Sequence, residues 1–234
     1  MNTRPFVILS RTFFFLGVVT GFILSVIIIW NNIESTNYYF IGVKYPRFKG
    51  LRCPVMIAPT EKGIVTTVFD NPTNEEDKFF YRAEVSGKAF SKRKIEDQIA
   101  VPPHQAKLFR FTVDTHDVDL LFFILVKITI FPNSVHSAQE STCGIMVANI
   151  LGLTGHQVPM AALFLSFSGI AVGLGLWQQS SLKSDRDLWR VAQTLGFVVL
   201  LTLLTAYLGW WAVAIALIVV SVLLMVISMR LAIA

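Results

Sequence analysis

Residues 12–30 read TFFFLGVVTGFILSVIIIW, a mostly apolar run without a charged side chain. A helix of about 20 such residues crosses the hydrocarbon core of a bilayer, which is roughly 30 Å thick. Residues 158–177, 188–207 and 210–229 form three further stretches of this length, each without charge at its centre. The sequence therefore predicts a multi-pass membrane protein with four transmembrane helices.

Composition and charge placement support this topology. The chain of 234 residues is 54% hydrophobic and 15% charged, whereas soluble domains are about 25% charged. Lys and Arg near the ends of spans stay on the cytoplasmic side. Six basic residues flank the predicted spans: Arg4, Arg11, Lys183, Arg186, Arg190 and Arg230. All six share one side if both termini are cytoplasmic, so we expect that orientation, with residues 178–187 as a short cytoplasmic loop.

The long segment between the first and second spans is then exterior. Residues 31–156 carry 14 Lys and Arg against 13 Asp and Glu, so the pI of 9.3 arises mainly from the cytoplasmic segments. A nearly neutral exterior argues against nucleic-acid binding, which needs a basic surface. The expected domains are residues 1–30, the cytoplasmic N-terminus and first transmembrane helix; residues 31–156, the exterior domain; and residues 157–234, the remaining helices.

The first span has the basic flanks of a signal peptide, so cleavage is the alternative to a permanent anchor. Its apolar run exceeds the usual signal-peptide length of about 7 to 15 residues and ends in Ile27 to Trp30 rather than in small residues. We interpret it as an uncleaved anchor. The chain has no Asn-x-Ser/Thr acceptor with a permitted middle residue, which favours a bacterial envelope. We therefore expect a plasma membrane, the bacterial inner membrane, with the exterior domain periplasmic or extracellular.

Short β-rich runs alternate with turn residues in the exterior domain, a pattern typical of an all-β sandwich. The candidate strands are residues 51–58, 63–69, 78–85, 89–94, 106–114, 119–131 and 142–149. Seven strands in about 100 residues predict an immunoglobulin-like sandwich. The expected fold class is an α+β membrane protein, with four transmembrane helices plus an exterior all-β immunoglobulin-like sandwich inserted between helix 1 and helix 2.

Two runs carry further information about the sheets. In residues 81–85 the alternation places Tyr81, Ala83 and Val85 on the inward face. Residues 120–131 are almost continuously apolar. This second run predicts either a central strand or a strand whose outer face is covered by a partner or by lipid.

The two cysteines, Cys53 and Cys143, lie in the first and last candidate strands of the exterior domain. An exterior compartment permits oxidation, so we favour a disulfide between them. The alternative is a pair of buried free thiols acting as small apolar residues. A redox pair is disfavoured because the sequence lacks a Cys-x-x-Cys spacing.

Four histidines lie in the exterior domain: His104, His116, His136 and His156. An envelope metal-handling or membrane-complex assembly factor, using these histidines with Met146 or Met160, is an alternative function. A membrane enzyme would require residues such as His116, Asp117 and Asp119 to cluster in a concave pocket. The sequence contains no nucleophile elbow, zinc-protease helix or Gly-rich phosphate loop. We expect no catalytic, cofactor-binding or metal-binding residues and no enzymatic activity.

The spans lack the ionisable midplane groups and broken helices of transporters and channels. Small residues instead mark candidate helix-packing faces: Gly17, Gly21, Ala162, Ser166, Gly169 and Gly173, with a weaker pair at Ala212 and Ala216. Such stripes let helices approach closely, either within this bundle or against a larger membrane partner.

The function expected from these features is that of a non-enzymatic integral-membrane accessory or scaffold subunit. Its sandwich would mediate protein–protein contact outside, while its helices pack in a larger complex. The expected partners are the lipid bilayer and other integral-membrane subunits, with no nucleic acid, no cofactor and no small-molecule substrate.

Overall fold

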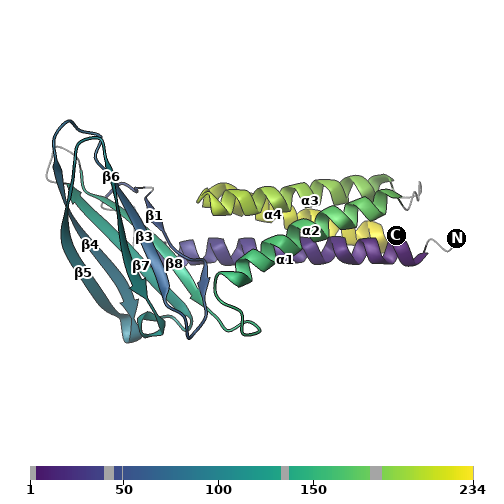
Figure 1. Cartoon of the computed structure of the whole chain (residues 1–234). Helices are drawn as coiled ribbons and strands as arrows, with labels where there is room; N and C mark the ends of the chain where they lie inside the picture. The colour runs from purple at the N-terminus through teal and green to yellow at the C-terminus, as the bar shows by residue number, and fades with distance from the viewer. Residues whose placement is uncertain (1–3, 40–44, 49, 133–136, 180–185, 234) are drawn as a thin grey trace. The chain divides into compact units, whose positions relative to one another are not determined.

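The computed structural model describes residues 4–39, 45–48, 50–132, 137–179 and 186–233 (Figure 1). The chain divides into two compact units. The helical unit comprises Met1–Ile29 and Pro159–Ala234, and the sheet domain comprises Trp30–Val158. In the chain, the sheet domain is inserted between the parts of the helical unit.

The described residues form four α-helices: α1 (Arg4–Tyr39), α2 (Gln157–Gln179), α3 (Arg186–Tyr207) and α4 (Trp211–Ile233). Each contains a stretch long and apolar enough to cross a membrane. The core of the helical unit is built from α1, α2 and α3, whose buried side chains include Phe14, Ile170 and Leu195. The predicted number of apolar helices is confirmed.

Helix α1 is longer than the expected span. The expected span is residues 12–30, whereas the helix that contains it continues to Tyr39. Residues 31–39 read NNIESTNYY and have no continuous apolar stripe. The apolar stretch therefore ends at Trp30, although the helix continues. Asn31, Ser35 and Tyr39 are nevertheless buried. Contacts with the sheet domain, rather than helix propensity, stabilise this extension.

The sheet domain contains eight strands in the residues described: β1 (Leu51–Arg52), β2 (Met56–Ile57), β3 (Gly63–Asp70), β4 (Asp77–Gly87), β5 (Ser91–Val101), β6 (Ala106–Val113), β7 (Phe123–Pro132) and β8 (Gln139–Val147). They form a three-stranded sheet of order β1-β3-β6 and a five-stranded sheet of order β2-β8-β7-β4-β5. Neighbouring strands are antiparallel except β2, which runs parallel to β8. Side chains from both sheets share one core, in which Phe69, Tyr81 and Ile145 are buried.

Two predicted strands differ from the structure for identifiable reasons. The expected strand at residues 51–58 is divided into β1 and β2, which belong to different sheets and are separated by Cys53, Pro54 and Val55. The expected strand at residues 89–94 is instead a 3-10 turn followed by β5, which is an edge strand. Most of β5 is exposed on both faces, so its sequence lacks the apolar alternation that marks a half-buried strand.

Strand β4 has the predicted alternation, since Tyr81, Ala83 and Val85 are all buried. Burial, followed by the charge of Asp97, raises the pKa of the Tyr81 phenol to about 12. In an unfolded chain this pKa is about 10. The folded state therefore favours the neutral phenol, and the stabilisation is complete below pH 10 and lost as the pH rises towards 12.

We accordingly expect the unfolding free energy of the protein to fall between pH 10 and pH 12. A Tyr81→Phe variant has no phenol to ionise, so its stability should fall less over the same interval. Urea unfolding of both proteins at several alkaline pH values measures the difference. Parallel losses in the two proteins would contradict the assignment to Tyr81.

Candidate functional site at the junction of helix and sheet

The last residues of α1 lie on the outer face of the five-stranded sheet. The Tyr39 hydroxyl donates to the carbonyl oxygens of Glu84 on β4, at 3.1 Å, and Leu125 on β7, at 3.0 Å. The Tyr39 ring packs in a buried cluster with Phe123 and Leu125. At the other end of this extension, Asn31 donates from Nδ2 to the carbonyl of Val55 at 2.8 Å. The extension therefore contacts the sheet from the β2 side to β4.

Gly144 on β8 makes this close approach possible. A Cβ atom at Gly144 would collide with the carbonyl of Asn31 and lie 3.1 Å from its Cα. Gly within a strand often marks such a site of backbone contact. The absence of a side chain at residue 144 thus sets how near α1 lies to the sheet.

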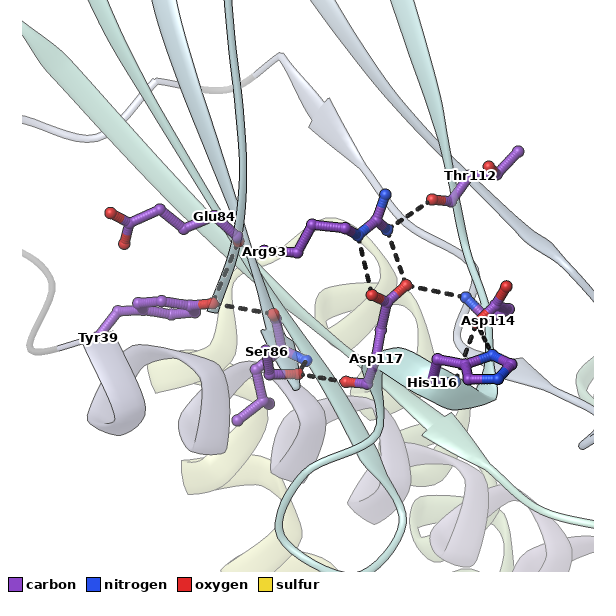
Figure 2. Close-up of polar contacts among 9 residues, drawn as sticks. Tyr39, Glu84, Ser86, Arg93, Thr112, Asp114, His116 and Asp117 are labelled. Carbon is purple, nitrogen blue, oxygen red and sulfur yellow. Dashed lines mark hydrogen bonds and ion pairs between the residues drawn. The ribbon is translucent and has the colours of Figure 1, made fainter. Parts of the chain in front are cut away.

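A polar cluster lies beside Tyr39 and joins neighbouring strands (Figure 2). Arg93 of β5 donates from Nε and Nη2 to the two carboxylate oxygens of Asp117, at 3.0 and 2.8 Å. The same guanidinium donates to the carbonyl of Thr112 on β6 at 2.9 Å. Arg93 therefore links the edge of one sheet to the other sheet through a two-point contact with a buried carboxylate.

Ser86 of β4 completes the cluster. Its hydroxyl donates to the carbonyl of Asp117 at 2.7 Å and accepts from the backbone N–H of Leu125 at 2.8 Å. Leu125 is the residue whose carbonyl accepts from Tyr39. The Ser86 hydroxyl is thus bonded to backbone groups inside the sheet domain and serves to hold the strands and the turn at Asp117 together.

The structure distributes His116, Asp117 and Asp119 among separate partners. The Nδ1 atom of His116 lies 3.0 Å from the Asp114 carboxylate, and its side chain is 88% exposed. Asp117 binds Arg93, and Asp119 accepts a hydrogen bond from the Tyr38 hydroxyl at 2.9 Å. Hydrogen bonding from the backbone N–H of His116 lowers the pKa of the Asp114 carboxyl. These contacts cap a turn and fix the helix end, and they do not combine a nucleophile with a base.

The start of α2 is also attached to the sheet domain. The Thr154 hydroxyl accepts from the N–H of Gln157 at 3.3 Å, and the Gln157 side chain accepts from the N–H of Thr154 at 3.0 Å, which is a capping box. Glu61 accepts from the N–H groups of Gly155, at 2.7 Å, and Ala58, at 3.0 Å. Its negative charge suits the positive end of the helix dipole. Both helices that enter the sheet domain are therefore held by it at specific residues.

A buried ion pair lies further along the outer face of the five-stranded sheet. Lys127 and Glu140 are 3.1 Å apart, and the Glu140 side chain is 2% exposed. The backbone of Glu140 bonds to Pro46 and Phe48, so residues 46–48 run beside β8. Within the apolar run at residues 120–131, residues 120–122 form a turn and the strand β7 begins at Phe123. This strand lies between β8 and β4, and Tyr39 of the same chain packs against Phe123 and Leu125 on its outer face.

The structure joins Cys53 and Cys143 by a disulfide, with their Cα atoms 6.3 Å apart. His104 contacts Asn74 through Nε2 at 2.8 Å. His156 and Met160 are exposed at the start of α2, and Met146 packs beside Tyr39. His136 lies outside the described residues. Within the described part of the chain, no three His, Cys, Asp or Glu side chains lie close enough together to hold a metal ion.

The candidate helix-packing residues lie mostly between α1 and α2. A Cβ added at Gly17 would meet backbone atoms of Ser166, Gly169 and Ile170 at 2.7 to 2.9 Å. One added at Gly173 would meet the backbone of Phe14. Gly21 faces the hydroxyl of Ser166 and also Val199 of α3, and Ala162 is half-buried. These two stripes therefore contact each other within the helical unit.

A cavity of about 410 Å³ lies at the end of the sheet domain away from the β4–β5 hairpin. Phe48, Phe69 and Phe79 supply apolar walls, and Asp70 and Asp77 supply carboxylates. Asp77 is buried, whereas Asp70 is exposed. The cavity thus combines an apolar interior with negative charge.

No protein-family model matches the chain, and no curated protein matches it in sequence. Among solved structures, β-glucuronidase 2 of Bacteroides uniformis shares 9% identity over 42% of this chain and 12% of its own, with a TM-score of 0.32. The CARDB domain of a Pyrococcus furiosus protein, bound to di-metal ions, shares 8% identity over 42% of this chain and 87% of its own, with a TM-score of 0.32. A β-glucosidase of Listeria innocua shares 12% identity over 43% and 16%, with a TM-score of 0.31. These TM-scores are too low to support any statement about this chain.

Tyr39, Ser86 and Arg93 have no pattern in the sequence that marks them as residues of a site. Their partners are distant in sequence, since Tyr39 bonds to residues 45 and 86 positions away. Two local signals were present. Gly144 interrupts a β-rich run, which indicates close backbone contact, and Thr154 with Gln157 has the spacing of a capping box.

Proposed function

We propose that the protein is a non-enzymatic accessory or scaffold subunit of a larger integral-membrane complex. The observation that carries the proposal is the use of polar side chains in the sheet domain. Tyr39, Ser86, Arg93, Asp117 and Glu61 hold one helix end, one helix start and the strands between them. These contacts attach the domain to the ends of its two helices. A domain held in this way outside the membrane would offer a defined binding surface to a partner, as a scaffold subunit does.

The proposal includes an immunoglobulin-like sandwich as the exterior domain, in the bacterial inner membrane with both termini cytoplasmic. Two facing sheets with a shared core support the sandwich. The six basic residues outside the sheet domain support the orientation, since Lys and Arg remain on the cytoplasmic side. The disulfide supports an oxidising exterior compartment.

Helix α4 provides a surface for a companion in the membrane. Ala214, Ser221 and Ser228 are buried on one face, whereas Ala212 and Ala216 are exposed on another. Small residues four positions apart allow close contact between membrane helices. In contrast to the stripes of α1 and α2, this pair remains open to a helix from another protein.

The cavity beside Asp70 provides a second surface, outside the membrane. Its phenylalanine walls suit the aliphatic stem of a Lys or Arg side chain, and the exposed carboxylate of Asp70 suits the cationic end. We propose that a basic side chain of a companion subunit inserts there.

Purification of the full-length protein in mild detergent, followed by native mass spectrometry, tests the proposal. We expect a stoichiometric membrane-protein companion, and a severalfold lower recovery of it with Ala216→Leu or Asp70→Lys. Val222→Leu, on an exposed part of α4 turned away from Ala216, and Asp97→Lys, on β5, are the matched controls. A lone monomer under conditions that preserve the fold would contradict the proposal.

A further inference from the structure

We propose that the turn of residues 149–153, between β8 and α2, is an interfacial anchor that inserts into the headgroup region of the bilayer. The occupant of its apolar surface is lipid. This inference rests on the membrane setting of the proposed function and does not depend on a companion subunit.

The tip of the turn is apolar and exposed. Leu151 is 93% exposed and Ile150 is 36% exposed. The N–H of Leu153 donates to the carbonyl of Ile150 at 2.9 Å and closes the turn. Turns in water are usually formed by Gly, Pro, Asn, Asp and Ser. A leucine that contacts almost nothing in its own domain gains from burial only where another apolar medium receives it.

The backbone of Leu151 points to the same conclusion. Its φ of 53° is in the left-handed region, which leucine rarely adopts and which glycine or asparagine adopts more readily. Gly152, the next residue, has a φ of 71°. In this conformation the Leu151 side chain lies at the tip of the turn and adds nothing to the core of the domain. The leucine is therefore suited to contact something outside the domain.

The position of the turn in the chain specifies lipid as its neighbour. Leu151 lies six residues before Gln157, the first residue of α2. Even a fully extended chain of this length spans only about 20 Å. The capping box at Thr154 and the bond from Gly155 to Glu61 fix the chain between them. The turn is therefore held within reach of the surface of the membrane that α2 enters.

The end of the span in α1 lies at the same edge of the sheet. Asn31, which follows the exposed Trp30, bonds to Val55. Ala148, which precedes the turn, bonds to Ile57 at 3.1 Å. The segment around β2 therefore bonds both to Ala148, just before the turn, and to Asn31, just after the end of the first apolar span. Trp is favoured at the membrane interface. We therefore place Trp30 and the turn of residues 149–153 at the same depth in the bilayer.

A second exposed leucine does not belong to the anchor. Leu121 is 92% exposed, but its neighbour Asp119 bonds to Tyr38. Tyr38 is roughly 12 Å along the helix from Trp30. Leu121 therefore lies beside the far end of the helix extension, and the proposal is restricted to residues 149–153.

Fluorescence quenching in vesicles tests the anchor. A bimane label is placed on Leu151→Cys in the full-length, disulfide-containing protein, reconstituted in vesicles of phosphatidylcholine and phosphatidylglycerol. His104→Cys is the matched control, because His104 is exposed and has a φ of 54° but lies between β5 and β6, at the other end of the sandwich. Val19→Cys is the reference within the bilayer, since Val19 is an exposed residue of α1.

We expect the label at residue 151 to be quenched by lipids that carry a shallow nitroxide and to be severalfold less accessible to aqueous iodide than the label at residue 104. Equal iodide accessibility at both sites would overturn the anchor. Shielding of residue 151 from both quenchers would also overturn it, because a protein would then cover the turn. Failure of lipid quenching at residue 19 would show that α1 is not in the bilayer. That result would contradict both proposals, because both assume a membrane protein. Lipid quenching at residue 151 in a protein that has no companion would leave the anchor intact and contradict only the scaffold function.

Discussion

Replacement of both Cys53 and Cys143 by alanine is expected to lower the unfolding free energy of the sheet domain by about 4 kcal/mol. The disulfide joins residues 90 positions apart. A cross-link across so long a loop restricts the unfolded chain, which raises the free energy of the unfolded state relative to the folded one. The unfolding free energy is measured by urea unfolding of the full-length protein in detergent. Hydrogen exchange of amides in β7 and β8 reports the unfolding of the sheet domain.

Single cysteine variants and chemical reduction provide the controls. Cys53→Ala and Cys143→Ala each remove the whole disulfide, so each should match the double variant closely. Dithiothreitol should destabilise the native protein and leave the double variant unchanged. If native protein with fully reduced cysteines unfolds at the same urea concentration as the oxidised protein, the disulfide does not contribute the expected stability.

Substitution of Gly144 by valine is expected to cost on the order of 3 kcal/mol and to release the end of α1 from the sheet. The new Cβ would overlap the backbone of Asn31, which cannot rotate away as a side chain can. Movement of the helix would then break the hydrogen bonds of Tyr39 and expose the cluster around Leu125. Hydrogen exchange of residues 31–39 should accelerate strongly, together with a lower urea midpoint.

Thr142→Val is the matched control for this substitution. Thr142 is on the same strand and the same face of the sheet as Gly144, since alternate residues of a strand share a face. It lies opposite Lys127 on β7 and two residues from Gly144, whose added Cβ would meet Asn31. We expect near-native exchange at residues 31–39 in this variant. Native exchange there in Gly144→Val as well would show that the contact with Asn31 does not hold the helix.

The apolar helices and the regular strands could be predicted because their signals are local. Twenty apolar residues predict a span without knowledge of any contact. Alternation along residues 81–85 likewise identified Tyr81, Ala83 and Val85 as buried. In both cases the residues that produce the pattern are neighbours in sequence.

The helix extension and the polar cluster could not be predicted in the same way. Residues 31–39 have the composition of a loop, and their helical state depends on strands that follow much later in the chain. Arg93 is one of many charged residues of β5, and only the fold identifies Asp117 as its partner. Strand β5 is polar on both faces because it is a sheet edge, and its position in the sheet becomes evident only after β4 is placed.

The separation between the two cysteines has a consequence for biosynthesis. If the sheet domain is exported, Cys53 crosses the membrane well before Cys143, because synthesis and translocation proceed from the N-terminus. Almost every strand of the domain lies between them. During that interval Cys53 is an unpaired thiol in an oxidising compartment, open to capture by small thiols or by another nascent chain. Correct oxidation therefore requires either delay or a thiol-exchanging catalyst that can undo an early error.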